Sequence, residues 1–208
     1  MNMTAGVIGL GSMGMGAAVS LVRAGITTLG LDLREEARAA FAAQGGMPAP
    51  DATTLGRLAD VVLVYVVNAA QTREALFGPE GAVAAARPGT VFVICVTMQP
   101  ADAAEICDRL IKAGMLAIDA PVSGGSVKAA EGQISMMASG PDAAFQRAAP
   151  VLDAISATVF RLGEAPGAGA RISPPAARRR WRERRGRAPA RRPARAGCLS
   201  GRCHSAPR

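Results

Sequence analysis

The chain has 208 residues and a formal net charge of +8, and that charge is divided unevenly along it. Residues 1–170 carry 11 Lys/Arg and 15 Asp/Glu, whereas residues 171–208 carry 13 Arg and a single acid, Glu183. A high isoelectric point normally suggests a nucleic-acid or membrane partner. Here that inference applies only to the last 38 residues, because the first 170 have the composition of a mildly acidic globular domain.

Strand and helix patterns alternate along the first 161 residues, as in proteins built from βαβ units. The predicted strands are 4–9, 27–32, 61–67, 90–96, 115–119, 132–138 and 157–161. The predicted helices are 12–24, 34–43, 54–59, 69–77, 100–113 and 142–154. Because the strands are continuous apolar runs rather than alternating ones, we predict a doubly wound α/β fold with a mainly parallel sheet buried on both faces.

A glycine-rich segment joins the first predicted strand to the first predicted helix. It has the pattern G-x-G-x-x-G, formed by Gly9, Leu10, Gly11, Ser12, Met13 and Gly14. The glycines allow a tight turn and a close approach of a pyrophosphate, while the N–H groups at a helix N-terminus favour anions. This context predicts a Rossmann-type dinucleotide-binding domain over residues 1–170, with a purely structural turn as the alternative.

Asp32 comes at the end of the second predicted strand, in the chain position where such sites place an acid. A carboxylate there accepts a hydrogen bond from the ribose 2′-OH and repels a 2′-phosphate, which favours NAD over NADP. Arg34 would instead favour NADP, because its side chain could turn towards the 2′-phosphate. The structural alternative is that Asp32 caps the following helix.

A second motif, DAPVSGG at residues 119–125, follows the predicted strand 115–119. The carboxyl edge of a parallel sheet is where α/β proteins bind ligands. The hydroxyl of Ser123 and the N–H groups of Gly124 and Gly125 could bind a substrate carboxylate. The same three residues could equally form a plain turn.

Three motifs together resemble the β-hydroxyacid dehydrogenase family: GLGSMGMG at 9–16, DAPVSGG at 119–125 and GQISMMASG at 132–140. Within the family, the stretches 66–72, 119–140 and 166–170 are most similar to the branch that acts on four-carbon sugar acids such as L-threonate. The resemblance covers about residues 1–170. It implies NAD-dependent hydride transfer from the carbinol carbon of a small hydroxy acid.

The resemblance also implies roles for residues that local patterns leave open. Val66, Val67, Asn68 and Thr97 are expected to line the nicotinamide end of the cofactor, and the Ser123–Gly125 turn to bind the substrate carboxylate. Many family members have Leu-Pro in place of Val66-Val67, and Ser-Thr where this chain has Val-Thr at 96–97, so only the threonine of that pair transfers. On local sequence alone, Thr97 could instead cap the helix 100–113.

In the family, a lysine on a long helix after Gly-x-Gly is the acid/base for the hydroxyl group. Its expected position is at or near Ser173, and the chain has no lysine beyond residue 170. Lys128 is predicted to be a solvated surface charge. Acid/base catalysis typically raises a reaction rate by ~10²–10⁴-fold, so its loss would be severe. The family's all-helical C-terminal domain, which builds its oligomer, is also expected to be missing. We therefore predict that the chain has no catalytic residue and does not turn over substrate.

Residues 171–208 consist mostly of Arg, Ala, Pro and Gly, and their large apolar residues are only Ile172, Trp181 and Leu199. We predict a disordered basic tail, because so few side chains cannot offset the entropy of ordering the backbone. Codons for these four amino acids can be written in G and C alone, so we interpret the tail as a frameshift product beginning near codon 171. The alternatives are a basic arm that binds polyanions, with Trp181 as a stacking residue, and an NAD-binding regulatory protein without catalysis.

The cysteines and the single histidine suggest no metal site. Cys95 and Cys107 fall in apolar stretches and are predicted to be core residues. Cys198, Cys203 and His204 lack a second pair of ligands at a zinc-like spacing. No apolar run approaches the ~20 residues that span a bilayer and no basic leader precedes the first strand, so a cytoplasmic location without a membrane partner is expected.

Overall fold

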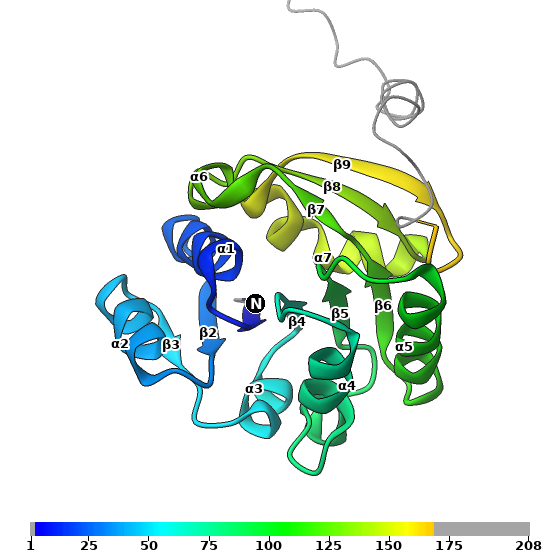
Figure 1. Cartoon of the computed structure of the whole chain (residues 1–208), viewed down its shortest axis with the longest axis horizontal. Helices are drawn as coiled ribbons and strands as arrows, with labels where there is room; N and C mark the ends of the chain where they lie inside the picture. Colours follow the sequence, from blue (N-terminus) through cyan, green and yellow to red (C-terminus); the bar gives the residue numbers. More distant parts are fainter. Residues whose placement is uncertain (1–2, 169–208) are drawn as a thin grey trace, which may run out of the picture.

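Helices cover both faces of a nine-stranded sheet in the computed structural model, which describes residues 3–168 (Figure 1). The first half contains β1 (Thr4–Ile8), α1 (Ser12–Arg23), β2 (Thr27–Leu31), α2 (Glu35–Ala43), β3 (Met47–Pro48), α3 (Ala52–Leu58), β4 (Val61–Val64), α4 (Ala69–Phe77) and the 3-10 helix η1 (Ala82–Ala85). The second half contains β5 (Val91–Ile94), α5 (Pro100–Lys112), β6 (Leu116–Asp119), β7 (Val122–Ser123), α6 (Gly125–Ala130), β8 (Ile134–Ser139), α7 (Asp142–Ile155) and β9 (Ser156–Gly163).

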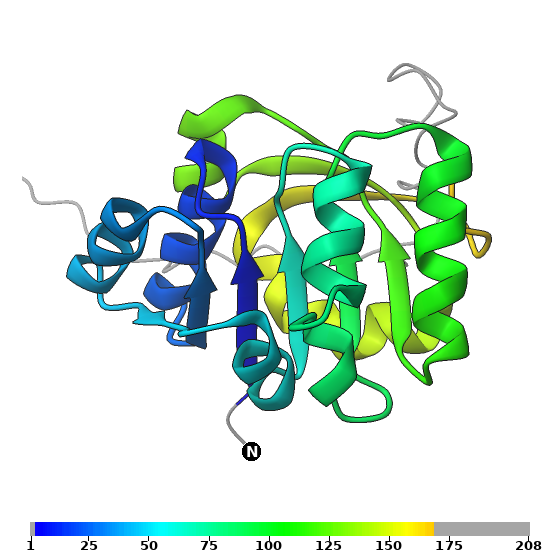
Figure 2. The same cartoon turned by 60° about the horizontal axis from the view of Figure 1, so that its bottom comes forward.

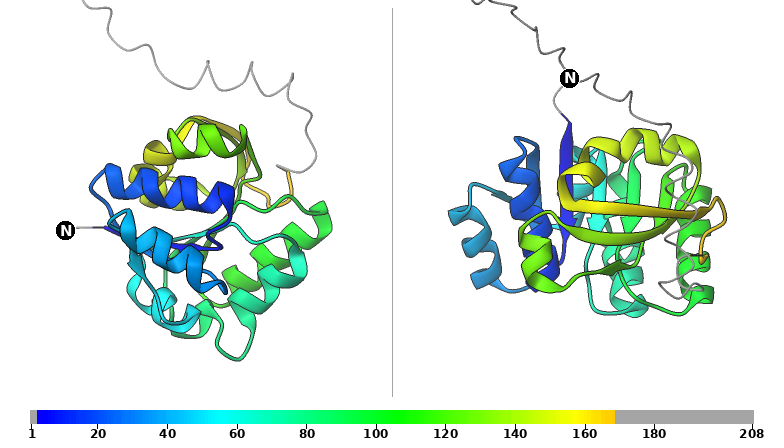
Figure 3. Two further views of the ribbon diagram at one scale, coloured as in Figure 1. Left: turned by 60° about the vertical axis from the view of Figure 1, so that its left-hand side comes forward. Right: turned by 90° about the horizontal axis from the view of Figure 1, so that it is seen from above.

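The sheet has the order β3-β2-β1-β4-β5-β6-β8-β7, and β9 pairs with β8. The strands from β3 to β6 are all parallel, so their carboxyl ends meet at one edge, where the arrowheads of Figure 2 point the same way. β8 runs antiparallel to β6 and β7 and parallel to β9, which lies beside it along the border of the sheet (Figure 3). The predicted doubly wound, mainly parallel α/β fold is therefore confirmed.

The central strands send alternate side chains into two separate cores. Val61 and Leu63 of β4 join the core beneath α1, α2 and α7, whereas Val62 and Val64 join the core beneath α3, α4 and α5. All four are fully buried. Burial on both faces explains why β4 is an uninterrupted apolar run, as the sequence indicated.

Several element boundaries differ from the prediction. The strand expected over 61–67 ends at Val64, because the chain leaves the sheet at Tyr65 and Asn68 then caps α4. Helix α6 and the short elements β3, β7 and η1 were not predicted. Each has six residues or fewer, too short for a periodic pattern, and α6 begins at Gly125, the second glycine of a motif for which the sequence left a binding site and a plain turn open.

The predictions for residues 171–208 lie outside the described residues. They include the domain boundary at 170, the basic tail, the expected lysine position at Ser173, and the residues Cys198, Cys203 and His204. Among residues 3–168, no helix combines the length and the apolar character needed to cross a membrane.

Candidate functional site

The three glycines of the fingerprint meet different surroundings at the carboxyl edge of β1. Gly9 has φ +93°, and a Cβ there would lie 2.7 Å from the carbonyl oxygen of Tyr65. A Cβ on Gly14 would overlap the carbonyl oxygen of Gly9. A Cβ on Gly11 would have no heavy atom within 4 Å. The fold itself therefore requires glycine at the first and third positions, whereas the middle glycine keeps open the space that a ligand would approach.

Helix α1 begins in this open space without a side-chain cap. Gly11 is the N-cap residue and offers no side-chain acceptor, and the first intrahelical bond runs from the N–H of Met15 to the carbonyl of Gly11, at 2.7 Å. No acidic residue stands in the first turn. The N–H groups of that turn and the positive end of the helix dipole are thus directed at the open space, an arrangement that suits a pyrophosphate.

Asp32 follows β2 and lies next to the glycine-rich loop. Its Oδ2 accepts a hydrogen bond from the N–H of Leu10 at 2.7 Å, and its Oδ1 accepts bonds from the backbone N–H and Nε of Arg34, both at 3.0 Å. Burial alone would raise the pKa of Asp32, but the hydrogen bonds from Arg34 and Leu10 outweigh it and hold that pKa below its usual value. The capping alternative is wrong, because the N-cap of α2 is Arg34.

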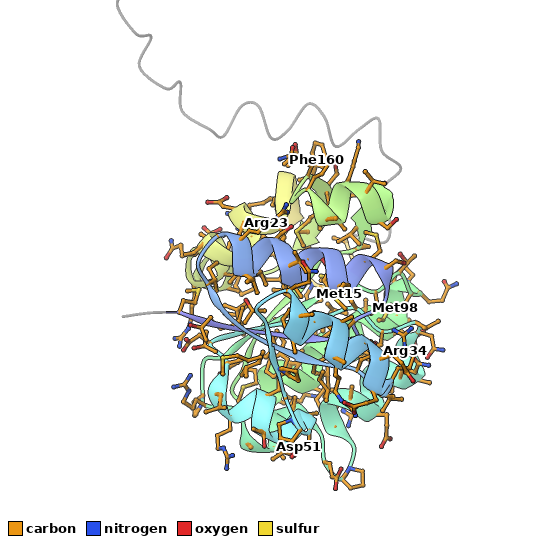
Figure 4. All side chains as sticks on the ribbon, turned by 90° about the vertical axis from the view of Figure 1, so that its left-hand side faces the viewer. Met15, Arg23, Arg34, Asp51, Met98 and Phe160 are labelled. Carbon is orange, nitrogen blue, oxygen red and sulfur yellow. The ribbon has the colours of Figure 1, made fainter. Side chains whose placement is uncertain are left out.

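A hollow of about 350 Å³ lies over the first turn of α1 and the start of α2. Figure 4 labels Met15 and Arg34 on its border. Its lining residues are Leu10, Gly11, Ser12, Met15, Arg34, Glu36 and Ala37. We call it the outer hollow. Its lining includes part of the fingerprint and Arg34, the residue whose side chain was expected to favour NADP.

A second hollow of about 470 Å³, the inner hollow, opens at the ends of β4, β5 and β6. Its lining residues are Met13, Tyr65, Val66, Val67, Cys95, Val96, Thr97, Val122, Ser123, Gly124 and Gly125. Residues expected at the nicotinamide end of the cofactor and residues expected to bind a carboxylate thus face the same space. Met13 connects it to the glycine-rich loop.

Asn68 and Thr97 differ in how they relate to this space. Asn68 is not among the lining residues; its Oδ1 accepts the N–H of Gln71 at 2.9 Å and so caps α4. Thr97 lines the inner hollow, and the N-cap of α5 is Gln99. The alternative in which Thr97 caps that helix is therefore wrong.

Tyr65 and Cys95 line the inner hollow and were missed as site residues by sequence reasoning. The Tyr65 hydroxyl is buried without a hydrogen-bond partner among the described residues. Burial, with the neighbouring Cys95 as a smaller cause, raises the pKa of Tyr65 well above its usual value. Tyr65 is the only tyrosine of the chain and comes directly after a buried strand, which was the available signal.

Both described cysteines are expected to resist alkylation in the folded chain. Burial raises the pKa of Cys95 to about 12, and burial likewise raises the pKa of Cys107. At pH 7.5, fewer than about one such thiol in a thousand is ionised, and the thiolate is the reactive form. Peptide mapping after iodoacetamide treatment should find both unlabelled in buffer and labelled in denaturant. Labelling of Cys95 in buffer at the rate of a free thiol would contradict this.

Lys128 lies close to the Ser123–Gly125 turn without lining the inner hollow. Gly124 and Gly125 have φ +141° and +75°, and a Cβ on Gly124 would lie 3.1 Å from both Cβ and Cδ of Lys128. The aliphatic stem of the lysine therefore passes over the glycine, while the residue is exposed. This position agrees with a solvated surface charge.

Asp119, the acid at the start of the second motif, has a structural role. It is 1% exposed, and its Oδ2 accepts the N–H of Gly167 at 3.0 Å. A Cβ on Gly167 would lie 2.8 Å from the carbonyl oxygen of Pro100, so this glycine packs tightly at the start of α5. Asp119 thereby fastens the last described residues to the carboxyl edge of β6.

Within residues 3–168, no three or more His, Cys, Asp or Glu side chains are grouped as a metal would require. The inner hollow has only two ionisable lining groups, Tyr65 and Cys95, and the pKa of each is raised. No histidine, lysine or carboxylate is among these lining residues.

Comparisons with known proteins agree with this geometry. The family model described as the NAD binding domain of 6-phosphogluconate dehydrogenase matches residues 4–163. L-threonate dehydrogenase of Escherichia coli (strain K12) is 48% identical over 168 residues, which are 80% of this chain and 56% of that protein. The chain therefore spans little more than half the length of this relative.

Solved structures show the same relationship. A crystal structure of 3-hydroxyisobutyrate dehydrogenase from Salmonella typhimurium is 45% identical with a TM-score of 0.78, covering 81% of this chain and 59% of that one. Psf3 in complex with NADP+ and 2-OPP is 29% identical with a TM-score of 0.76, covering 80% and 59%. The similar structures thus include one that was solved with NADP+.

Proposed function

Because this chain belongs to the family of the NAD-binding domain of 6-phosphogluconate dehydrogenase, we propose that residues 3–168 bind NAD across the outer and inner hollows. The observation that carries this proposal is Gly11, whose missing side chain leaves open space at the uncapped start of α1. Asp32, held ionised beside that space, supports NAD over NADP because a carboxylate repels a 2′-phosphate. When bound, NAD supplies the hydride acceptor.

The substrate class follows from the second motif and from the similar proteins. Ser123, Gly124 and Gly125 are exposed in the inner hollow and offer a hydroxyl and backbone N–H groups to a carboxylate. The Escherichia coli relative carries the name of a dehydrogenase of L-threonate, a small hydroxy acid. The reaction to which this domain is suited is therefore oxidation of such an acid at its carbinol carbon.

We further propose that this chain alone binds the cofactor without turning substrate over. The inner hollow has no lining group that titrates near neutral pH, and the sequence has no lysine after Lys128. The missing proton transfer corresponds to a loss of ~10²–10⁴-fold. Lys128 itself is not among the residues that line the inner hollow.

Titration calorimetry with NAD and NADP, alongside an assay of NADH formation at 340 nm with L-threonate, tests these proposals. We expect binding of NAD, weaker binding of NADP, and no NADH above background. The L-threonate dehydrogenase of Escherichia coli provides the positive control for the assay. NADH formation by this chain would overturn the second proposal and direct attention to Lys128, whereas absence of NAD binding would overturn the first.

A further inference from the structure

Helix α1, which starts at the proposed cofactor site, also contacts the short helix α6 (Figures 1 and 3). Gly16, in the first half of α1, is the point of closest approach. A Cβ there would lie 2.6 Å from the backbone nitrogen of Ala130 and 2.8 Å from the Cβ of Ala129. Only glycine allows the two helices to lie this close.

Two polar side chains of α1 bind the C-terminal carbonyls of α6. The Ser20 hydroxyl is 4% exposed and lies 3.1 Å from the carbonyl oxygen of Ala129 and 3.3 Å from that of Ala130. The guanidinium of Arg23, labelled in Figure 4, donates to the carbonyl of Ala130 and, at 3.0 Å, to the Ser20 hydroxyl. These side chains satisfy carbonyls that the last turn of a helix leaves unpaired, and a cation suits that end of the dipole.

The opposite ends of the same two helices bear the two ligand motifs. α1 starts directly after Gly11, and α6 starts at Gly125, with Ser123 and Gly124 just before it. A six-residue helix is not stable by itself in water, since isolated helices below ~12–15 residues are marginal. The position of the exposed Ser123–Gly125 turn therefore depends on what holds α6 to the rest of the domain.

We propose that Ser20 and Arg23 are positioning residues that fix the Ser123–Gly125 turn relative to the glycine-rich loop, so that cofactor binding at α1 also orders the carboxylate-binding turn. Neither residue touches the ligand in this account; each acts through the backbone of α6. The second half of the proposal rests on the proposed binding of NAD.

Amide hydrogen exchange across residues 123–133, with and without saturating NAD, tests the proposal. The variants are Ser20→Ala and Arg23→Ala, with Arg57→Ala as the matched control, an exposed arginine in the last turn of α3. The N–H groups of Glu131, Gly132 and Gln133 bind carbonyls of α6, whereas those of its first turn have no partner in the helix. In both variants we therefore expect exchange at 129–133 to be faster by about threefold or more, as expected for a lost hydrogen bond. Exchange in β1, β4 and β5 should not change.

Gly16→Ala provides a second route to the same displacement. Alanine raises helix propensity, so it would stabilise α1 if α6 were absent, but here its Cβ presses on Ala130. We expect faster exchange at 129–133 in this variant too. In the unchanged chain NAD should slow exchange at 129–133, and in Ser20→Ala that slowing should be lost or much reduced.

Unchanged exchange at 129–133 in the ligand-free variants would overturn the proposal. A uniform rise across the sheet would do so as well, because it would show a general structural role. The ligand-free comparison does not depend on the cofactor. Failure of the unchanged chain to bind NAD at all would instead contradict the proposed function and the ordering by cofactor, and would leave the ligand-free comparison to decide whether the two side chains position the turn.

Discussion

Gly11→Ala is expected to weaken NAD binding by about tenfold or more, equivalent to about 1.4 kcal/mol, while hardly changing the ligand-free domain. The added Cβ meets no heavy atom within 4 Å, so it fills only the space proposed for the pyrophosphate. Because alanine is a poorer N-cap than glycine, a small loss of stability, up to about 1 kcal/mol, is allowed. Calorimetry with NAD and equilibrium unfolding in urea measure the two effects.

Gly14→Ala is the matched comparison, since it adds the same methyl group three residues later. Here the Cβ would overlap the carbonyl oxygen of Gly9, and both partners are backbone or fixed to it. We expect the free energy of unfolding to fall by about 3 kcal/mol, a large part of the stability of a small domain. Unchanged NAD affinity in Gly11→Ala would contradict the proposed cofactor site, and equal stability of the two variants would contradict the close packing described at Gly14.

Asp32→Asn is expected to weaken NAD binding by about 10–100-fold, the range for a lost charge-assisted hydrogen bond. NADP affinity should fall less or rise, because the carboxylate that repels its 2′-phosphate is gone. The pKa of Asp32 is lowered by Arg34 and the N–H of Leu10, so the carboxylate stays ionised until the pH falls below its usual ~3.9. NAD affinity of the unchanged chain should therefore be constant between pH 8 and about 5.

Arg34→Ala is the control for this prediction. In the ligand-free chain, Arg34 pairs with Asp32 at 3.0 Å and also lines the outer hollow. Its removal should leave NAD affinity unchanged or higher, because Asp32 is then free for the ribose, and should weaken NADP. A parallel loss of both cofactors in Asp32→Asn and Arg34→Ala would show a structural pair rather than a selective one.

The fold class could be predicted from the sequence because the apolar pattern of the strands and the glycine fingerprint indicate the same fold. Uninterrupted apolar strands predicted a sheet buried on both faces, and the two cores found on either side of β4 are the reason for that pattern. Two glycines of the fingerprint, Gly9 and Gly14, are required by close backbone contacts within the fold, whereas a Cβ on Gly11 would meet no heavy atom within 4 Å.

Other features depend on contacts between segments that are distant in the chain, so local sequence patterns did not predict them. The C-terminal end of helix α6 is bound by Ser20 and Arg23, which lie more than a hundred residues earlier in the chain. The buried hydroxyl of Tyr65 and the bond from Gly167 to Asp119 likewise appear only once the strands are aligned. For the same reason, local sequence could not decide between a binding site and a plain turn at Ser123–Gly125.

The bond between Asp119 and Gly167 has a consequence for the modularity of this domain. It fixes the last described residues at the carboxyl edge of β6, where the ligand-binding strand ends meet. The described chain is thereby held to the sheet at Gly167, 48 residues after the acid that binds it. In terms of the proposed function, residues 3–168 are a cofactor-binding unit to which recombination or protein design can attach different substrate-binding segments.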